Sequence, residues 1–224
     1  MTSAAARAEP ALLREWLGPV ALEAFLASHL GRLPIAQPGT ATGARTLCDW
    51  SVLEAVLAAT DPPPDVLVVA RGRLLPVPAP RSLAELRALL ARGVGLSLRR
   101  TERCHPSLER VAAAFRPLGR SHVQLFVTPA RTYGFGWHYD DEDVFIAQTA
   151  GVKDYYFRAN TVAREPATAA AFRRLASESS PVYSARLAPG DFLYVPARWW
   201  HTALCVQDAL SISVGVHVDE HTRA

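Results

Sequence analysis

The stretches GWHYD (residues 136–140) and GDFLYVPARWWH (residues 190–201) decide how this chain is interpreted. The first contains a His-x-Asp pair, His138 and Asp140, and the second ends on another histidine, His201. Side chains two residues apart on a β-strand point to the same face, so a strand over the first stretch would direct both toward one metal ion. Two imidazoles and one carboxylate on one face of a metal leave the opposite positions open, as in non-haem Fe(II) sites. Together the two stretches predict a metal site formed by His138, Asp140 and His201.

The chain has a single lysine, Lys153, among its 24 basic residues. It follows His138 by fifteen positions, on a stretch with the composition of a strand. A lysine ammonium is a compact point charge that can hold a carboxylate. The placement favours a role for Lys153 in binding an anionic ligand, and the alternative is a surface lysine without such a role.

Several motifs around these residues resemble the JmjC-type, cupin-like 2-oxoglutarate oxygenases, especially the ribosomal-oxygenase branch and its small bacterial relatives. The run GFGWHYDDEDVFIAQ (residues 134–148) is similar to that family's glycine-rich approach, His-x-Asp pair and following strand. The resemblance includes VTP (127–129), continues through Gly151 and Lys153, and resumes over PGDFLYVPARWWH (189–201) and ALSISVGV (209–216). It extends over about residues 121 to 218.

The resemblance implies a complete set of site residues and cofactors. His138, Asp140 and His201 would hold Fe(II), and 2-oxoglutarate and O2 would take the open positions. Lys153 would pair with the distal carboxylate of 2-oxoglutarate, assisted by Thr128 or Ser211. The reaction implied is hydroxylation of an unactivated C–H bond, with a peptide or protein side chain as the substrate. Hydroxyls on strands also commonly form cross-strand hydrogen bonds, which is the alternative for Thr128 and Ser211.

The chain departs from the family pattern at positions around the metal residues. Arg198 stands where the cupin pattern has glycine, and Gln124 stands where asparagine is frequent. Arg198 could meet a substrate carboxylate, or it could form a surface ion pair. These departures leave two alternatives open: the same chemistry on a small natural product or amino acid, and a catalytically silent cupin that acts as a binding module.

Composition limits the other classes of function. The chain has 224 residues, of which 50% are hydrophobic and 20% charged, as expected for one globular domain. No apolar run approaches the ~20 residues of a membrane span, and three scattered cysteines favour reduced thiols and a cytoplasmic location. The net charge of +3 comes without an aromatic-interleaved basic patch, so no nucleic-acid partner is predicted. The sequence leaves the oligomeric state open.

Hydrophobic patterns divide the chain into a helical part and a β-rich part. Residues 1–120 are expected to form helices with a few strands, packed on a catalytic core of residues 121–224 within one structural domain. Helices are predicted over 11–16, 20–30, 52–59 (capped by Ser51), 83–91 (capped by Ser82) and 106–115, with strands over 65–70 and 93–98. Seven short strands are predicted over 122–128, 143–149, 153–157, 182–187, 191–195, 202–206 and 209–217, with a helical insertion over 167–177. The fold class predicted is mainly β, a jelly-roll-like double-stranded β-helix of the cupin type with flanking helices.

Overall fold

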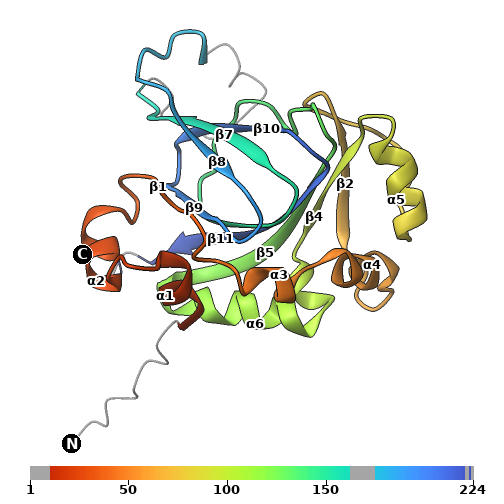
Figure 1. The fold of residues 1–224 in the computed structure, drawn as a ribbon, viewed down its shortest axis with the longest axis horizontal. Helices are drawn as coiled ribbons and strands as arrows, with labels where there is room; N and C mark the ends of the chain where they lie inside the picture. Colours follow the sequence, from red (N-terminus) through yellow and green to blue (C-terminus); the bar gives the residue numbers. More distant parts are fainter. Residues whose placement is uncertain (1–10, 162–174, 220–221, 223–224) are drawn as a thin grey trace, which may run out of the picture.

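Two facing β-sheets form the centre of the molecule in a computed structural model that describes residues 11–161, 175–219 and 222 (Figure 1). The larger sheet has eight strands in the order β1 (Ile35–Gln37), β9 (Phe192–Val195), β6 (Asp143–Ala150), β11 (Ala209–Val218), β5 (Gly119–Thr128), β4 (Gly95–Arg99), β2 (Asp65–Ala70) and β3 (Arg73–Leu74). The smaller sheet has three strands in the order β10 (Trp200–Cys205), β7 (Lys153–Arg158) and β8 (Tyr183–Leu187). Every strand pair is antiparallel, and the predicted mainly β, jelly-roll fold is confirmed.

Alternation along β6 explains why the larger sheet can pack on both faces. Phe145 and Ala147 belong to the core beneath the helices, whereas Val144 and Ile146 belong to the cluster between the two sheets. Successive side chains of a strand point to opposite faces, and here both faces are apolar. The run DVFIA therefore forms a central strand buried on both sides.

The seven strands expected from residue 122 onward are all present, with ends that differ by one to three residues. Strand β1 was not among the strands predicted from the sequence. Ile35 pairs with Tyr194 and Gln37 with Phe192, so β1 is an edge strand added to β9. A three-residue strand bounded by turns has no periodic pattern of its own, and only its partner defines it.

The N-terminal strands extend the larger sheet beyond the β-helix. Leu96 on β4 pairs with Val127 on β5, and β2 pairs in turn with β4. Arg71 and Gly72 connect β2 to β3 with positive φ angles of 51° and 73°, as a two-residue type I′ hairpin turn requires. The Gly72 N–H donates to the Gly134 carbonyl at 3.1 Å, which brings this hairpin against the glycine-rich segment before His138.

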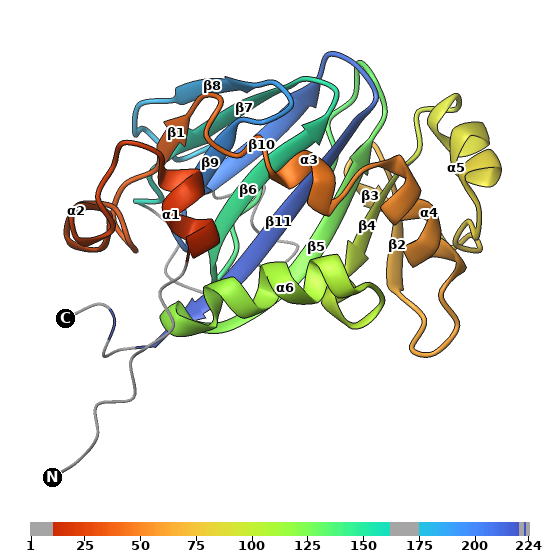
Figure 2. The same cartoon turned by 60° about the horizontal axis from the view of Figure 1, so that its bottom comes forward.

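Within the described residues, six α-helices flank the sheets: α1 (Ala11–Leu17), α2 (Leu22–Ser28), α3 (Ala44–Leu47), α4 (Trp50–Ala58), α5 (Leu83–Leu90) and α6 (Pro106–Phe115). Figure 2 shows α6 lying across the outer face of the larger sheet, close to β5 and β11. Phe115 at its end packs on Phe145 and Trp16, with ring centroids 4.9 Å and 5.3 Å apart. The helices thus cover one face of the larger sheet and leave its other face to the smaller sheet.

Local signals for the helix ends are correct for two helices and wrong for one. The Ser82 hydroxyl accepts from the Glu85 N–H at the start of α5, and Pro106 begins α6, as predicted. The predicted cap at Ser51 is wrong, because the Asp49 carboxylate caps α4 by accepting from the N–H groups of Ser51 and Val52. Aspartate and serine are comparable N-caps, so Asp49 and Ser51, two positions apart, cannot be separated by residue type.

Two expectations concern parts of the chain other than the sheets. The helical insertion predicted over 167–177 lies almost entirely outside the described residues. Within the ranges that the structure describes, no helix has the length and apolar character needed to cross a membrane.

Candidate metal centre

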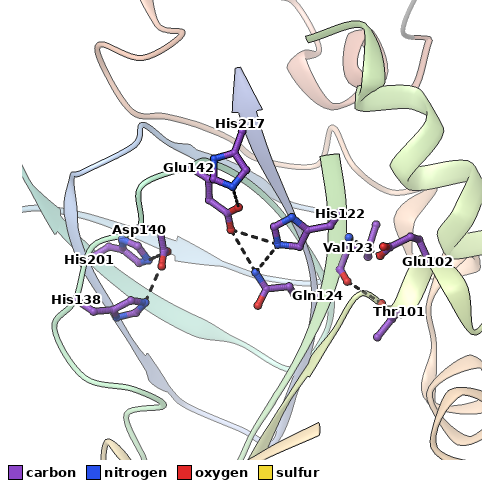
Figure 3. Close-up of polar contacts among 10 residues, drawn as sticks. All are labelled: Thr101, Glu102, His122, Val123, Gln124, His138, Asp140, Glu142, His201 and His217. Carbon is purple, nitrogen blue, oxygen red and sulfur yellow. Dashed lines mark hydrogen bonds and ion pairs between the residues drawn. The ribbon is translucent and has the colours of Figure 1, made fainter. Parts of the chain in front are cut away.

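The predicted metal residues come together between the two sheets. His138 and His201 form an isolated antiparallel bridge, in which each backbone N–H donates to the other residue's carbonyl at 3.0 Å and 2.8 Å. The Asp140 Oδ2 lies 3.9 Å from His138 Nε2 and 3.5 Å from His201 Nε2, and one ligand atom from each residue lies within 4.8 Å of the others (Figure 3). The three side chains could hold one metal ion.

The backbone around His138 and Asp140 is not a regular strand. Over residues 136–140 the structure has only a single bridge, at His138. Gly136 adopts φ +75°, which an extended strand does not allow. The common direction of His138 and Asp140 therefore comes from the bridge to His201 and from the Arg198 N–H, which donates to the Asp140 carbonyl at 2.7 Å.

Backbone carbonyls orient both imidazoles for metal binding. His138 Nδ1 lies 2.8 Å from the Gly136 carbonyl oxygen, and His201 Nδ1 lies 3.1 Å from that of Trp199. A carbonyl oxygen only accepts, so each Nδ1 carries the proton and each Nε2 keeps its lone pair. Such an arrangement fixes the tautomer that ligates through Nε2, and the donor set fits a divalent transition metal.

Burial keeps His201 neutral. The residue is 7% exposed, and this burial, followed by the effect of nearby His138, lowers the pKa of its imidazole to about 4, with Asp140 acting in the opposite direction. A metal binds only the deprotonated nitrogen. His201 is therefore in its ligating form at neutral pH.

Acidification of the metal-free protein is expected to reduce its free energy of unfolding through His201. The folded-state pKa of about 4 lies below the ordinary value of 6.5, so the unfolded chain binds the proton more tightly. Stability is then full above about pH 6.5 and falls as the pH drops towards 4, by a loss on the order of 3 kcal/mol. Urea unfolding at several pH values should show a shallower dependence for His201→Gln than for wild type. Equal dependences in the two proteins would contradict this account.

A cavity of about 600 Å³ opens beside the three metal residues. Lys153 and Thr128 line it, and aromatic side chains such as Phe135, Trp137 and Tyr155 form part of its wall. A further part of the wall is polar and comes from His122, Gln124 and Glu142. The volume falls within the range of small-ligand sites, about 300–1,000 Å³.

Lys153 lies inside the protein, so the surface-lysine alternative is wrong. Its side chain is 2% exposed, its Nζ donates to Ser211 Oγ at 3.0 Å, and burial lowers the pKa of its ammonium. Among the described residues it forms no ion pair with a carboxylate. A buried ammonium without a counter-ion is costly, and an anionic ligand in the cavity would supply the missing charge.

The two hydroxyl candidates have different surroundings. Ser211, on β11, contacts both the Lys153 ammonium and the Tyr155 hydroxyl, whose hydrogen bond partly offsets the rise in the Tyr155 pKa that burial causes. Thr128, on β5, lines the cavity and shares a hydrogen bond with the Cys205 thiol. Ser211 therefore positions the lysine, and Thr128 faces the space beside it.

Arg198 lies outside the cavity wall. Its Nε is 3.8 Å from Asp141 Oδ1 on the surface, which agrees with the ion-pair alternative. Its φ of 66° is left-handed, which explains why glycine is usual at this turn of the cupin pattern. Arg198 contributes to the site through its backbone N–H, which donates a hydrogen bond to the Asp140 carbonyl.

The polar wall contains residues that the sequence analysis did not select. His122 Nε2 and Gln124 Nε2 each lie 3.4 Å from Glu142 Oε1, and Glu142 raises the pKa of His122 (Figure 3). His122 and Gln124 are two apart on β5 and share a face, which is a signal that could have placed His122 beside Gln124. No local pattern connects either residue to Glu142.

A family model described as the JmjC domain matches residues 98–223. Curated relatives match less than half of the chain, and two of them illustrate this. The bifunctional lysine-specific demethylase and histidyl-hydroxylase NO66 of Drosophila persimilis is 32% identical over 94 residues, which is 41% of this chain and 13% of the relative. Ribosomal oxygenase 2 of Bos taurus is 37% identical over 97 residues, which is 42% of this chain and 20% of the relative.

A solved structure of YcfD, a ribosomal oxygenase from Escherichia coli in complex with cobalt and 2-oxoglutarate, is similar in fold. It superposes with a TM-score of 0.64 and 18% identity, over 90% of this chain and 53% of the YcfD chain. The chain thus spans about half of this structural relative and a fifth or less of the two curated ones. At this identity the structural likeness shows the fold alone. With the family model matched over more than half of its residues, the chain belongs to the JmjC domain family.

Proposed function

We propose that this chain is an Fe(II)- and 2-oxoglutarate-dependent oxygenase that hydroxylates a C–H bond on a peptide or protein side chain. The observation that carries the proposal is the convergence, in one cavity, of His138, Asp140 and His201 with the buried ammonium of Lys153. Two histidines and one carboxylate are the ligand set of non-haem Fe(II) oxygenases. The names of the relatives, ribosomal oxygenase and histidyl-hydroxylase, support a protein substrate.

The residues of the chain have distinct tasks in this proposal. His138, Asp140 and His201 would hold the iron, and when bound, iron, 2-oxoglutarate and O2 would supply the oxidising chemistry. Lys153 would bind the distal carboxylate of 2-oxoglutarate, with Ser211 orienting its ammonium and Thr128 as a second candidate partner. Phe135, Trp137 and the other apolar wall residues would exclude water. We place the protein in the cytoplasm, where a reducing environment keeps iron as Fe(II).

Two alternatives differ in substrate and in class. A cavity of about 600 Å³ also accommodates a small natural product or an amino acid, so the same chemistry on such a substrate is the second candidate. A silent cupin is disfavoured, because a binding module does not need a complete ligand set beside a buried lysine. A peptide library compared with a metabolite panel would separate the two enzymatic candidates.

Anaerobic reconstitution with Fe(II), followed by addition of 2-oxoglutarate and air, is expected to yield succinate even without a substrate, at a low rate. The triad and Lys153 bind metal and cosubstrate independently of the substrate, so this turnover tests the reaction class alone. Succinate is measured by mass spectrometry, with protein lacking metal as the control. A protein that binds neither Fe(II) nor 2-oxoglutarate would refute the proposed function and favour the silent cupin.

A further inference from the structure

A single turn of the chain contacts two of the three metal residues. It consists of residues 196–199, between β9 and β10, and its last N–H donates to its first carbonyl at 3.2 Å. The Arg198 N–H donates to the Asp140 carbonyl at 2.7 Å, and the Trp199 carbonyl oxygen lies 3.1 Å from His201 Nδ1. A shift of this turn would therefore move Asp140 and His201 together.

The shape of the 196–199 turn does not determine where the turn lies. Arg198, its third residue, has a φ of 66°, as the third residue of a type II turn does. These dihedral angles define the turn itself and leave its distance from the metal residues free. A contact from outside the turn has to hold it in place.

A buried carboxyl group provides such a contact. Asp143, the first residue of β6, is fully buried, and its Oδ1 accepts from the Ala197 N–H of the turn at 3.3 Å. The Tyr194 hydroxyl on β9 donates to the same oxygen, and the Gly31 N–H donates to the Tyr194 oxygen at 2.6 Å. Because β6 and β9 are paired strands, the larger sheet holds this carboxyl group and, through it, the turn.

Packing alone does not explain a polar residue at this position. Phe145 and Ala147 follow Asp143 on the same face of β6, and both belong to the apolar core. Burying a carboxyl group is costly unless hydrogen bonds reach it, so an apolar residue would suit the core better. What the carboxyl group adds is an acceptor for the Ala197 N–H.

We propose that Asp143 is a positioning residue for the metal centre, which sets the places of Asp140 and His201 by holding the 196–199 turn. This inference rests on the metal centre of the proposed function. Asp143 acts through the turn and is not one of the three ligands. The third ligand, His138, is reached only indirectly, through its backbone bridge to His201.

Co(II) alone is the probe for this role, because its visible absorption depends on the geometry of its ligands. Asp143→Ala removes the acceptor, so it is expected to change the Co(II) spectrum and to lower the affinity by about tenfold or more, as loss of the hydrogen bonds behind metal ligands does. Asp143→Asn keeps an oxygen acceptor, so it should retain the affinity and the spectrum. One spectrophotometric titration without 2-oxoglutarate measures both.

A second variant moves the turn and leaves the carboxyl group in place. Ala197→Pro replaces the N–H that faces Asp143 Oδ1 with a ring carbon, so the turn has to move away. Proline is common as the second residue of a type II turn, so the shape of the turn should be kept. We expect a changed Co(II) spectrum and a lower affinity, as for Asp143→Ala.

The matched control is Val111→Ala, in the buried core on α6 and away from the cavity wall. It should lower the midpoint of thermal unfolding and leave the affinity and the spectrum of Co(II) unchanged. Thermal unfolding also shows which variants fold, and Ala197→Pro decides alone if Asp143→Ala does not.

Three outcomes would contradict the proposal. Wild-type affinity and spectrum in the folded turn variants would overturn it, and so would a spectral change in Val111→Ala as large as theirs. Absence of Co(II) binding by the wild-type protein would overturn the metal centre of the proposed function, and this inference with it. The two failures are distinguishable, because only the last one concerns the wild-type protein.

Discussion

Replacing His138 with alanine is expected to abolish iron binding and succinate formation. His138 is one of three side chains whose ligand atoms lie within 4.8 Å of one another, and its Nε2 lone pair is directed to the site by the Nδ1 contact to Gly136. Mutating a residue that hydrogen-bonds to a metal ligand typically lowers metal affinity by about 10- to 100-fold. Loss of the ligand itself should therefore lower it by more than about 100-fold. Fe(II) affinity is measured anaerobically by titration, and succinate by mass spectrometry.

The matched control for this variant is His29→Ala. His29 follows α2, far from the cavity wall, and its Nδ1 contacts only the Leu33 carbonyl among the described residues. This control should bind iron and form succinate as wild type does. If His138→Ala kept wild-type iron affinity, the metal would have to bind elsewhere, and the proposed centre would be wrong.

Replacing Lys153 with methionine is expected to have opposite effects on cosubstrate binding and on stability. The buried ammonium has Ser211 as its hydrogen-bond partner and no carboxylate among the described residues, and burial lowers its pKa. Methionine has a similar length and no charge, so the free energy of unfolding of the metal-free protein should rise by about 1–3 kcal/mol. Affinity for 2-oxoglutarate should fall by about 100-fold, as expected when the partner of a buried charge is lost.

Lys153→Arg separates charge from shape in this experiment. Arginine keeps the positive charge but is larger and cannot reach the same position beside Ser211 unchanged, so it should recover part of the 2-oxoglutarate affinity without the gain in stability. Urea unfolding gives the stabilities, and calorimetric titration of the Mn(II)-loaded proteins gives the affinities. A Lys153→Met protein that bound 2-oxoglutarate as wild type does would remove Lys153 from the cosubstrate site.

The predictions that succeeded rest on short-range patterns. Short apolar runs bounded by turns are enough to predict the β-rich half. The run over residues 143–150 is the first clear example after the His-x-Asp pair. The His-x-Asp pair with a distal histidine likewise selects three residues whose ligand atoms the structure places within 4.8 Å of one another. The convergence of these side chains depends on the bridge between His138 and His201, which neither short segment predicts alone.

Other features depend on contacts between residues far apart in the chain. Strand β1 exists only because Ile35 pairs with Tyr194, and Lys153 on β7 is buried where its ammonium reaches Ser211 on β11, a strand of the other sheet. The N-terminal half was expected mainly to supply helices, yet its strand β4 joins the larger sheet through β5. Pairing partners of this kind leave no periodic signal within the short segments themselves.

The amino-acid sequence by itself determined the fold class and the three candidate metal residues, because strand patterning and ligand type are properties of short segments. Only the tertiary structure decided which other side chains share their cavity. Glu142 and His122 belong to separate segments, and they meet on the cavity wall only because Glu142, just before β6, lies against β5 in the folded chain. The candidate metal residues are therefore visible as short sequence motifs, whereas the polar wall of the cavity depends on long-range packing that no local pattern records.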